Sequence, residues 1–331
     1  MIEEILPRLH RVVVPLTGNP LKEINSYVLT SDDRNLIIDT GMSRPDCKQV
    51  LEAGLDEIGV DLERTDFIAT HLHADHAGLI SDLLRRGSRA FMGALDAAIM
   101  QVGFADLTKI IPVGEYAIRS GFPADEMRAS LQNHPGNKYS SSAIVDYVPL
   151  EGGETFEVGD YRLQVVPTPG HTSGHVSLYE PDKKIFFSGD HVLGDITPNI
   201  QAWSDDQDPL ALYLSSLKKV DELDVELCLP GHRSLIDDFR QRIAELQEHH
   251  RERANEVIAI LKGNRKTAYQ TAGEMSWDIV ARSWDDFPIM QRWFATGEAI
   301  AHLRYVEAKG LIERELVDGQ TLYSSDGRSS L

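Results

Sequence analysis

The stretch His71-Leu72-His73-Ala74-Asp75-His76 places four potential metal ligands within six positions of the chain. It follows the apolar run Phe67-Ile68-Ala69-Thr70, which predicts a β-strand, and it precedes Gly78, where glycine permits a tight turn. Imidazole and carboxylate groups hold zinc or iron in hydrolytic sites. The first two histidines are two residues apart, so extended backbone would point them the same way. We expect the last two ligands to follow at a turn and to face a second ion nearby.

Three later segments each combine an apolar strand pattern with a turn residue and one further ligand. They are Val165–His171, Lys184–Asp190 and Glu226–His232, and each ends on the ligand itself. A short buried strand that leads through a turn to a polar side chain is typical of a site at the carboxyl ends of strands. Together with the hexapeptide, these segments predict a metal centre assembled from distant parts of the chain.

With these motifs, residues 8 to 245 resemble the metallo-β-lactamase-fold hydrolase superfamily, including the strand Ile24–Leu29 and the strand-turn Leu36–Gly41. The resemblance implies an α/β (α+β) fold, a four-layer αβ/βα sandwich with two metal ions at one edge between mixed sheets. It also implies the ligand roles. The first ion is expected on His71, His73 and His171, the second on Asp75, His76 and His232, with Asp190 bridging the two.

The resemblance further implies that Asp39 supports the site from behind the ligands, since a metal-bound histidine needs a hydrogen-bond partner for its other nitrogen. The alternative is that Asp39 only forms the turn before Thr40. The implied cofactors are two divalent ions per chain, with zinc favoured and iron or manganese as alternatives.

Composition and charge restrict the remaining possibilities. The chain has 331 residues, 42% of them hydrophobic, and no apolar stretch long enough for a membrane span. It starts with an acidic segment unlike a secretory signal and has two cysteines without CxxC spacing, so we expect a cytoplasmic protein. The net charge of −19 disfavours a protein that mainly grips nucleic-acid phosphates.

An insertion at about residues 92–147 shows helical segments without strand alternation, and the superfamily resemblance implies that it covers the metal cleft. Tyr139 in this lid and Trp203, in the loop that leaves Asp190, are the substrate-pocket candidates. Phe104 is a further lid candidate. The alternative for the aromatic residues of the lid is packing inside the helical lid itself.

The chain is expected to divide into a catalytic domain, residues 1–250, and a winged-helix-like domain, residues 251–331. In the second domain, three helical segments are followed by a hairpin around Asp318-Gly319-Gln320. This order of elements resembles the winged-helix tail of the lactamase-β-2-like branch. The third helix, within Gln291–Lys309, mixes acidic with basic residues. Packing, completion of a pocket or formation of a homodimer is therefore favoured over DNA binding.

The predicted reaction is hydrolysis by a metal-bridging hydroxide, with Asp75 and Asp190 as catalytic residues and Asp75 handling the proton. Asp at position 190 differs from the cysteine of one lactamase class, which disfavours a β-lactamase. Leu193 stands where one group of lactonases has tyrosine. A small acyl substrate, a thioester or other carboxylic ester, is therefore predicted. A phosphodiesterase or RNA endonuclease and a lactonase are alternatives, and an iron-dependent sulfur dioxygenase is a minor one.

Overall fold

The structure is a computed structural model that describes residues 1–102, 113–141, 143–279, 281–327 and 330–331. Its contacts group the chain into two compact units, each made of three segments. Unit 1 comprises Met1–Phe104, Pro135–Pro198 and Ser216–Ile243, and unit 2 comprises Ala105–His134, Asn199–Ser215 and Ala244–Leu331. The contacts group residues by packing and do not test the domain boundary expected at residue 250, which remains a prediction.

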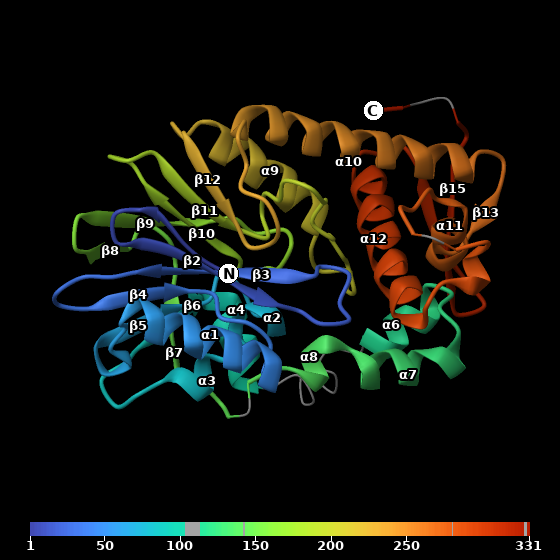
Figure 1. The fold of residues 1–331 in the computed structure, drawn as a ribbon. Helices are drawn as coiled ribbons and strands as arrows, with labels where there is room; N and C mark the ends of the chain where they lie inside the picture. Colours follow the sequence, from blue (N-terminus) through green and yellow to red (C-terminus); the bar gives the residue numbers. More distant parts are fainter. Residues whose placement is uncertain (103–112, 142, 280, 328–329) are drawn as a thin grey trace. The chain divides into compact units, whose positions relative to one another are not determined.

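The first sheet of unit 1 has seven strands in the order β1 to β7, antiparallel from β1 to β4 and parallel from β4 to β7 (Figure 1). Parallel neighbours require crossover connections, and α1 and the short helices after β5 provide them. Pro45 begins α1 and left-handed Gly59 ends it, each at a helix terminus where that residue type is favoured. The elements are β1 (Ile2–Leu6), β2 (Leu9–Pro15), β3 (Glu23–Leu29), β4 (Asn35–Ile38), α1 (Pro45–Ile58), β5 (Thr65–Ile68), α2 (Ala74–Ala77), α3 (Ile80–Leu83), β6 (Ala90–Gly93), α4 (Ala94–Val102), α8 (Pro135–Lys138) and β7 (Tyr147–Leu150).

The second sheet of unit 1 has five strands in the order β12-β11-β10-β9-β8. The strands β11 and β12 pair in parallel, and α9 (Pro209–Asp221) lies between them in the chain. The strands are β8 (Thr155–Val158), β9 (Tyr161–Pro167), β10 (Val176–Glu180), β11 (Ile185–Gly189) and β12 (Leu227–Pro230). The helix α10 (Phe239–Leu261) follows, and its first residue packs against Phe186 of β11 with ring centroids 5.3 Å apart.

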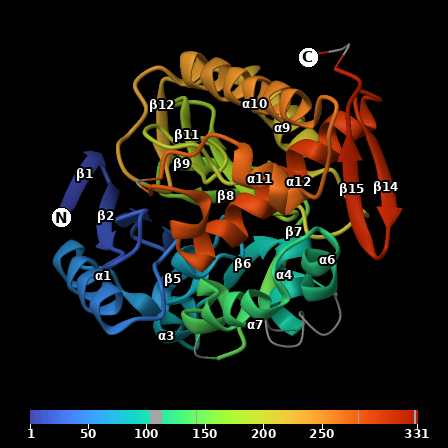
Figure 2. The same ribbon diagram turned by 90° about the vertical axis from the view of Figure 1, so that its right-hand side faces the viewer.

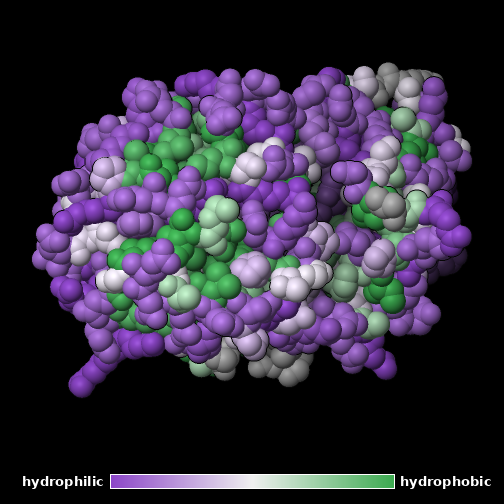
Figure 3. Space-filling view, in the orientation of Figure 1, coloured by the Kyte–Doolittle hydropathy of each residue, from purple (hydrophilic) through white to green (hydrophobic). Residues whose placement is uncertain are grey.

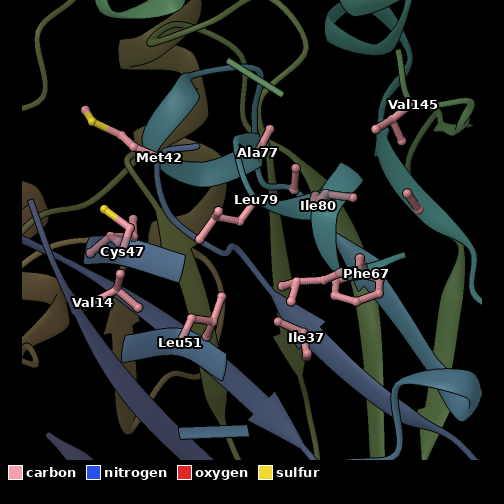
Figure 4. Close-up of a cluster of buried hydrophobic side chains, with 14 of the residues drawn as sticks. Val14, Ile37, Met42, Cys47, Leu51, Phe67, Ala77, Leu79, Ile80 and Val145 are labelled. Atoms are coloured by element: carbon pink, nitrogen blue, oxygen red, sulfur yellow. The ribbon is translucent and has the colours of Figure 1, made fainter. Parts of the chain in front are cut away.

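Alternating side chains of the first sheet form two separate cores. One face, including Ile37 and Phe67, packs against Leu51 of α1 and Ile80 of α3 (Figure 4). The other face, including Ile38, packs with residues of the second sheet into another buried cluster. Period-two alternation therefore places helices on one side of the first sheet and the second sheet on the other. With α10 beginning on the outer face of the second sheet, this is the expected αβ/βα layering.

Unit 2 is mostly helical and has a small sheet of strand order β13-β15-β14. Figure 2 shows β14 and β15 of this sheet side by side. Its core contains Phe122 and Trp293, whose rings meet edge to face at 5.2 Å. The unit includes part of α9, most of α10, α6 (Val113–Arg119), α7 (Ala124–Asn133), β13 (Arg265–Lys266), α11 (Ala268–Glu274), α12 (Ile289–Ala308), β14 (Glu313–Val317) and β15 (Gln320–Ser324). The helices and hairpin expected after residue 251 are present, and their assignment as a winged helix remains a prediction.

Within the described residues, no helix is both long enough and apolar enough to cross a membrane. The face drawn in Figure 3 is mostly hydrophilic, with hydrophobic residues in smaller patches.

Candidate metal centre

Three of the predicted ligands converge at the end of the first sheet. His71 and His73 lie in the loop after β5, and His171 lies in the loop between β9 and β10. His73 Nδ1 is 2.9 Å from His71 Nε2 and 3.0 Å from His171 Nε2. His71 is fully buried, whereas the other two are partly exposed. Three imidazole nitrogens that face one another at this range form a group able to hold one cation.

A second group adjoins the first. Asp75 and His76 lie on α2, and His232 follows β12. His232 Nε2 is 3.5 Å from Asp75 Oδ2, and the side chains of all three are buried. These atoms form a second set able to hold a cation.

Asp190, directly after β11, lies between the two groups. Its Oδ1 is 3.4 Å from His76 Nε2 and 3.5 Å from His232 Nε2, and its Oδ2 is 3.6 Å from His171 Nε2. One carboxylate therefore presents one oxygen to each group of histidines, as a bridging ligand would.

The buried donor atoms of this centre fit a cation. His76 Nε2, His232 Nε2 and Asp190 Oδ1 have no hydrogen-bond partner in the described part of the chain, although each is completely buried. Leaving such groups unsatisfied costs free energy, and a cation bound between them would remove that cost. Nitrogen and oxygen donors of this kind suit zinc and related divalent ions.

Hydrogen bonds from outside the centre fix the opposite nitrogens of the rings. His76 Nδ1 lies 2.8 Å from Asp39 Oδ2, and His232 Nδ1 donates to the carbonyl oxygen of Glu23 at 2.6 Å. Asp39 also accepts the backbone N–H of Thr70 at 2.8 Å. Asp39 and the carbonyl oxygen of Glu23 therefore contact the ring nitrogens at which a hydrogen-bond partner orients a metal-bound histidine.

Asp39 and Asp190 favour positive charge on the histidines beside them. Burial opposes the charged form of His76, but Asp39 and Asp190 outweigh it and raise the pKa of His76 well above its ordinary value. Burial likewise opposes the charged form of Asp190, but His232 and His76 hold the pKa of that carboxyl well below its usual range. Burial and the neighbouring histidines lower the pKa of His71. The centre therefore attracts positive charge, and a divalent ion would compete with protons for it.

Two further buried side chains position parts of the centre without any motif that marks them. His175, buried directly before β10, accepts the backbone N–H of Asp190 at Nε2 (3.2 Å) and contacts Thr168 Oγ1 at 2.8 Å. Asn25 on β3 donates to the carbonyl oxygens of Pro230 and Arg233, both at 3.0 Å, on either side of His232. His175 lies four residues after His171 in the loop between β9 and β10, whereas no local pattern identifies Asn25, because its partners lie far away in sequence.

The two substrate-pocket candidates lie in different units. Tyr139, in unit 1, is partly buried, and the Arg44 guanidinium lies over its ring at 5.4 Å. Trp203, in unit 2, stacks on Trp293 with centroids 4.2 Å apart. Phe104 lies outside the described residues. A role in substrate binding remains a prediction for all three.

Comparisons with known proteins identify the family of this chain. The family model described as "Metallo-beta-lactamase superfamily" matches residues 20–232. A metallo-beta-lactamase family protein of Thermus thermophilus has a similar structure, with 27% identity and a TM-score of 0.83 over 97% of this chain and 100% of that one. A beta-lactamase domain protein of Burkholderia ambifaria is 26% identical in sequence, with a TM-score of 0.82 over 98% of this chain and 94% of that one.

Two curated relatives are more distant in sequence. An "Atrochrysone carboxyl ACP thioesterase" of Emericella nidulans is 25% identical over 82% of this chain and 70% of its own length. A "Beta-lactamase-like protein 2 homolog" of Caenorhabditis elegans is 23% identical over 94% of this chain and 89% of its own. The likeness of the solved structures confirms the predicted fold class.

Proposed function

The chain belongs to the metallo-beta-lactamase superfamily of metal-dependent hydrolases, and from this premise we propose that it hydrolyses a thioester or other carboxylic ester with two divalent ions. One observation carries the proposal: seven side chains from four separate segments converge in three overlapping groups that could each hold an ion. We assign His71, His73 and His171 to the first ion, Asp75, His76 and His232 to the second, and Asp190 to both. Zinc is the ion that these donors favour.

Ions bound here would supply Lewis acidity, which lowers the pKa of a water molecule and polarises a substrate carbonyl. The protein's own part is to position groups and to exchange protons. Asp75 Oδ2, 3.5 Å from His232 Nε2, is an acceptor for the proton that an attacking water must lose. The partial exposure of His73 and His171 leaves that side of the centre open to a substrate.

The choice of a thioester rests on the relatives. Several fungal proteins that match about four-fifths of this chain bear the name "Atrochrysone carboxyl ACP thioesterase". A phosphodiesterase or RNA endonuclease is the second candidate, which the resemblance of the tail to the lactamase-β-2-like branch implies; the "Beta-lactamase-like protein 2 homolog" matches 94% of the chain. The net charge of −19 opposes this alternative.

The test is metal analysis of the purified protein combined with a panel of acyl thioesters, lactones, bis-p-nitrophenyl phosphate and short RNA. We expect two ions per chain and fastest turnover of a thioester or ester, abolished by a chelator and restored by zinc. The Asp190→Ala variant, purified in parallel, controls for contaminating hydrolases. One ion per chain would contradict the dinuclear centre, and a preference for the phosphodiester or RNA would favour the second candidate.

A further inference from the structure

Asp96, near the start of α4, is a buried carboxylate that the proposed chemistry does not use. It is fully buried and accepts three hydrogen bonds. Its Oδ2 accepts the backbone N–H of Leu72 at 3.0 Å and the hydroxyl of Thr172 at 2.7 Å, and its Oδ1 accepts the backbone N–H of Gly174 at 2.7 Å. Leu72 lies between two histidines of the first group, and Thr172 directly follows the third. One side chain therefore ties together the two loops that carry this group.

The backbones at this junction are in direct contact. A Cβ added to Gly174 would lie 2.3 Å from the backbone nitrogen of Asp96, and one added to Gly93 would lie 1.9 Å from the carbonyl oxygen of Gly174. No side chain fits between these segments without moving the backbone. The end of β6 and the loop before β10 are therefore in close backbone contact, and Asp96 links the loop after β5 to both.

A carboxylate suits this position better than its amide. All three partners of Asp96 donate, so the group that receives them needs acceptor oxygens and no hydrogen of its own. In an Asp96→Asn variant, the NH₂ group would face at least one of these donors. Burial raises the pKa of Asp96 to about 6, although the hydrogen bonds from Thr172, Leu72 and Gly174 oppose this rise. Burying the charged carboxylate of Asp96 therefore costs free energy. A residue whose role was packing alone could be apolar and would not carry this cost.

We propose that Asp96 is a positioning residue that sets the distance of His171 from His71 and His73 and thereby the affinity of these three histidines for their ion. The inference rests on the proposed function, because it assigns an ion to this group. Zinc–nitrogen bonds of about 2.0–2.1 Å tolerate little displacement of their donors. If the tie is lost, the two loops can separate, and the three nitrogens no longer meet at one point.

The experiment compares the metal binding of wild type, Asp96→Asn and Asp66→Asn. Asp66 is the matched control, because it is a buried carboxylate at the start of β5 whose partners are Arg34 and Arg89, away from both loops. Zinc affinity is measured by chelator competition, and the absorption spectrum of the Co²⁺-substituted protein reports the surroundings of each ion. We expect Asp96→Asn to weaken one of the two ions by about 10- to 100-fold, as loss of an outer hydrogen-bond partner does elsewhere. The other ion and its spectrum stay unchanged, and Asp66→Asn binds both ions as wild type does.

Thr172→Val provides a second variant, which removes one of the three hydrogen bonds without changing a charge. It should weaken the same ion by a smaller factor, and it keeps the inference testable if Asp96→Asn does not fold. Unchanged affinity in both variants, or equal losses in Asp96→Asn and Asp66→Asn, would overturn the positioning role while leaving the proposed function intact. A wild-type protein that binds no divalent ion would overturn the proposed function and this inference with it.

Discussion

Asp39 and Asp190 are both buried carboxylates, yet their surroundings give them different tasks. The oxygens of Asp39 are occupied by Thr70 and by His76 Nδ1. Asp190 instead directs Oδ1 at two histidines without a hydrogen-bond partner among the residues that the structure describes. Asp39 is therefore suited to orient a ligand, and Asp190 is suited to be one.

Replacing Asp190 by alanine should reduce activity more than any change outside the centre, by more than about 100-fold, the upper end for losing an outer partner. The reason is that its two oxygens face both groups of histidines. Steady-state kinetics and metal content of Asp190→Ala check this, with Asp66→Asn as a control for loss of a buried carboxylate. Activity within a few-fold of wild type would refute the bridging role.

Replacing Asp39 by asparagine should lower metal affinity by about 10- to 100-fold with little change in fold. Asp39 has a positive φ of 59°, and asparagine tolerates this conformation, so the backbone should stay in place. The amide keeps one oxygen but no longer offers two acceptors to Thr70 and His76. Chelator competition measures the affinity. If Asp39 only forms a turn, Asp39→Asn will bind metal as tightly as wild type.

At the scale of elements, local pattern predicted most helices and strands but not the shape of the metal loop. Extended backbone was expected to align His71 and His73, but β5 ends at Ile68, and both histidines lie in irregular structure before α2. Gly78 was expected to allow a tight turn, yet it is right-handed helical, with φ −62°. It is needed because a Cβ there would lie 2.7 Å from the carbonyl oxygen of Gly41. Such contacts between distant segments are absent from any local pattern.

The helices α10 and α12 of unit 2 meet through a buried histidine pair that no motif identified. His302 Nδ1 donates to the carbonyl oxygen of Glu298 at 2.9 Å, so His302 Nε2 accepts from His250 Nδ1 at 3.2 Å. Both rings are buried. Protonation of His302 would bring two donors face to face. Burial accordingly lowers the pKa of His302 to about 3 and that of His250 well below its ordinary value.

Acidification should therefore destabilise unit 2. A histidine with a lowered folded-state pKa stabilises the fold above its ordinary value of 6.5, and this stability is lost as the pH falls toward the folded-state value. Between about pH 6.5 and 5, each such histidine should remove up to about 1.4 kcal/mol of unfolding free energy per pH unit. His302→Gln should reduce the dependence of the unfolding free energy on pH by the contribution of one histidine.

Urea unfolding followed by tryptophan fluorescence measures this slope, since all four tryptophans, at positions 203, 277, 284 and 293, lie in unit 2. His10→Gln, on β2 of unit 1, is the control and should leave the slope unchanged. Equal slopes for wild type and His302→Gln would show that the pair does not sense pH.

At the scale of the whole molecule, the sequence suggested a boundary in the chain, whereas the contacts define units by packing. Phe122, in the expected lid, packs on Trp293, in the expected tail. Trp203, in the loop after β11, stacks on the same tryptophan. Composition and periodicity describe neighbours in sequence, so they could not show that three separate segments share one core. The family could be predicted from the sequence, and the side chains expected as ligands lie together, because each of their segments carries a recognisable strand and turn.

Deletion of residues 251–331 should consequently destabilise the rest of unit 2 instead of releasing an intact catalytic domain. It removes Trp293 and leaves Phe122, now 2% exposed, without its partner. Exposing a buried aromatic side chain costs about 1.5–3 kcal/mol, and the deletion also cuts α10 within its length. Soluble yield, binding of a hydrophobic dye and size-exclusion behaviour check this, with Trp293→Phe as a mild control. A soluble, monomeric product that binds no dye would support a boundary at residue 250.

Three arginines of unit 2 share one carboxylate partner, and this pairing predicts weak binding of nucleic acid. Arg304 on α12 and Arg314 on β14, the helix and wing that would contact DNA in a winged helix, both bind Asp205, at 2.6 and 2.5 Å. Arg119 binds the same carboxylate at 2.6 Å, and Glu307 binds Arg314 at 2.8 Å. Phosphate binding requires basic groups free to replace counterions, and these guanidinium groups already have carboxylate partners.

Intact protein should therefore bind RNA or DNA no more tightly than the micromolar range of non-specific binding at physiological salt. Asp205→Asn removes the shared carboxylate and should increase affinity, with a steeper dependence on salt, because the released arginines can then contact phosphates. Fluorescence anisotropy of labelled RNA and DNA at several salt concentrations measures both quantities, with Asp206→Asn as the neighbouring control. Tight, salt-sensitive binding by wild type, unchanged by Asp205→Asn, would show that nucleic acid binds elsewhere and would favour the nuclease alternative over the esterase.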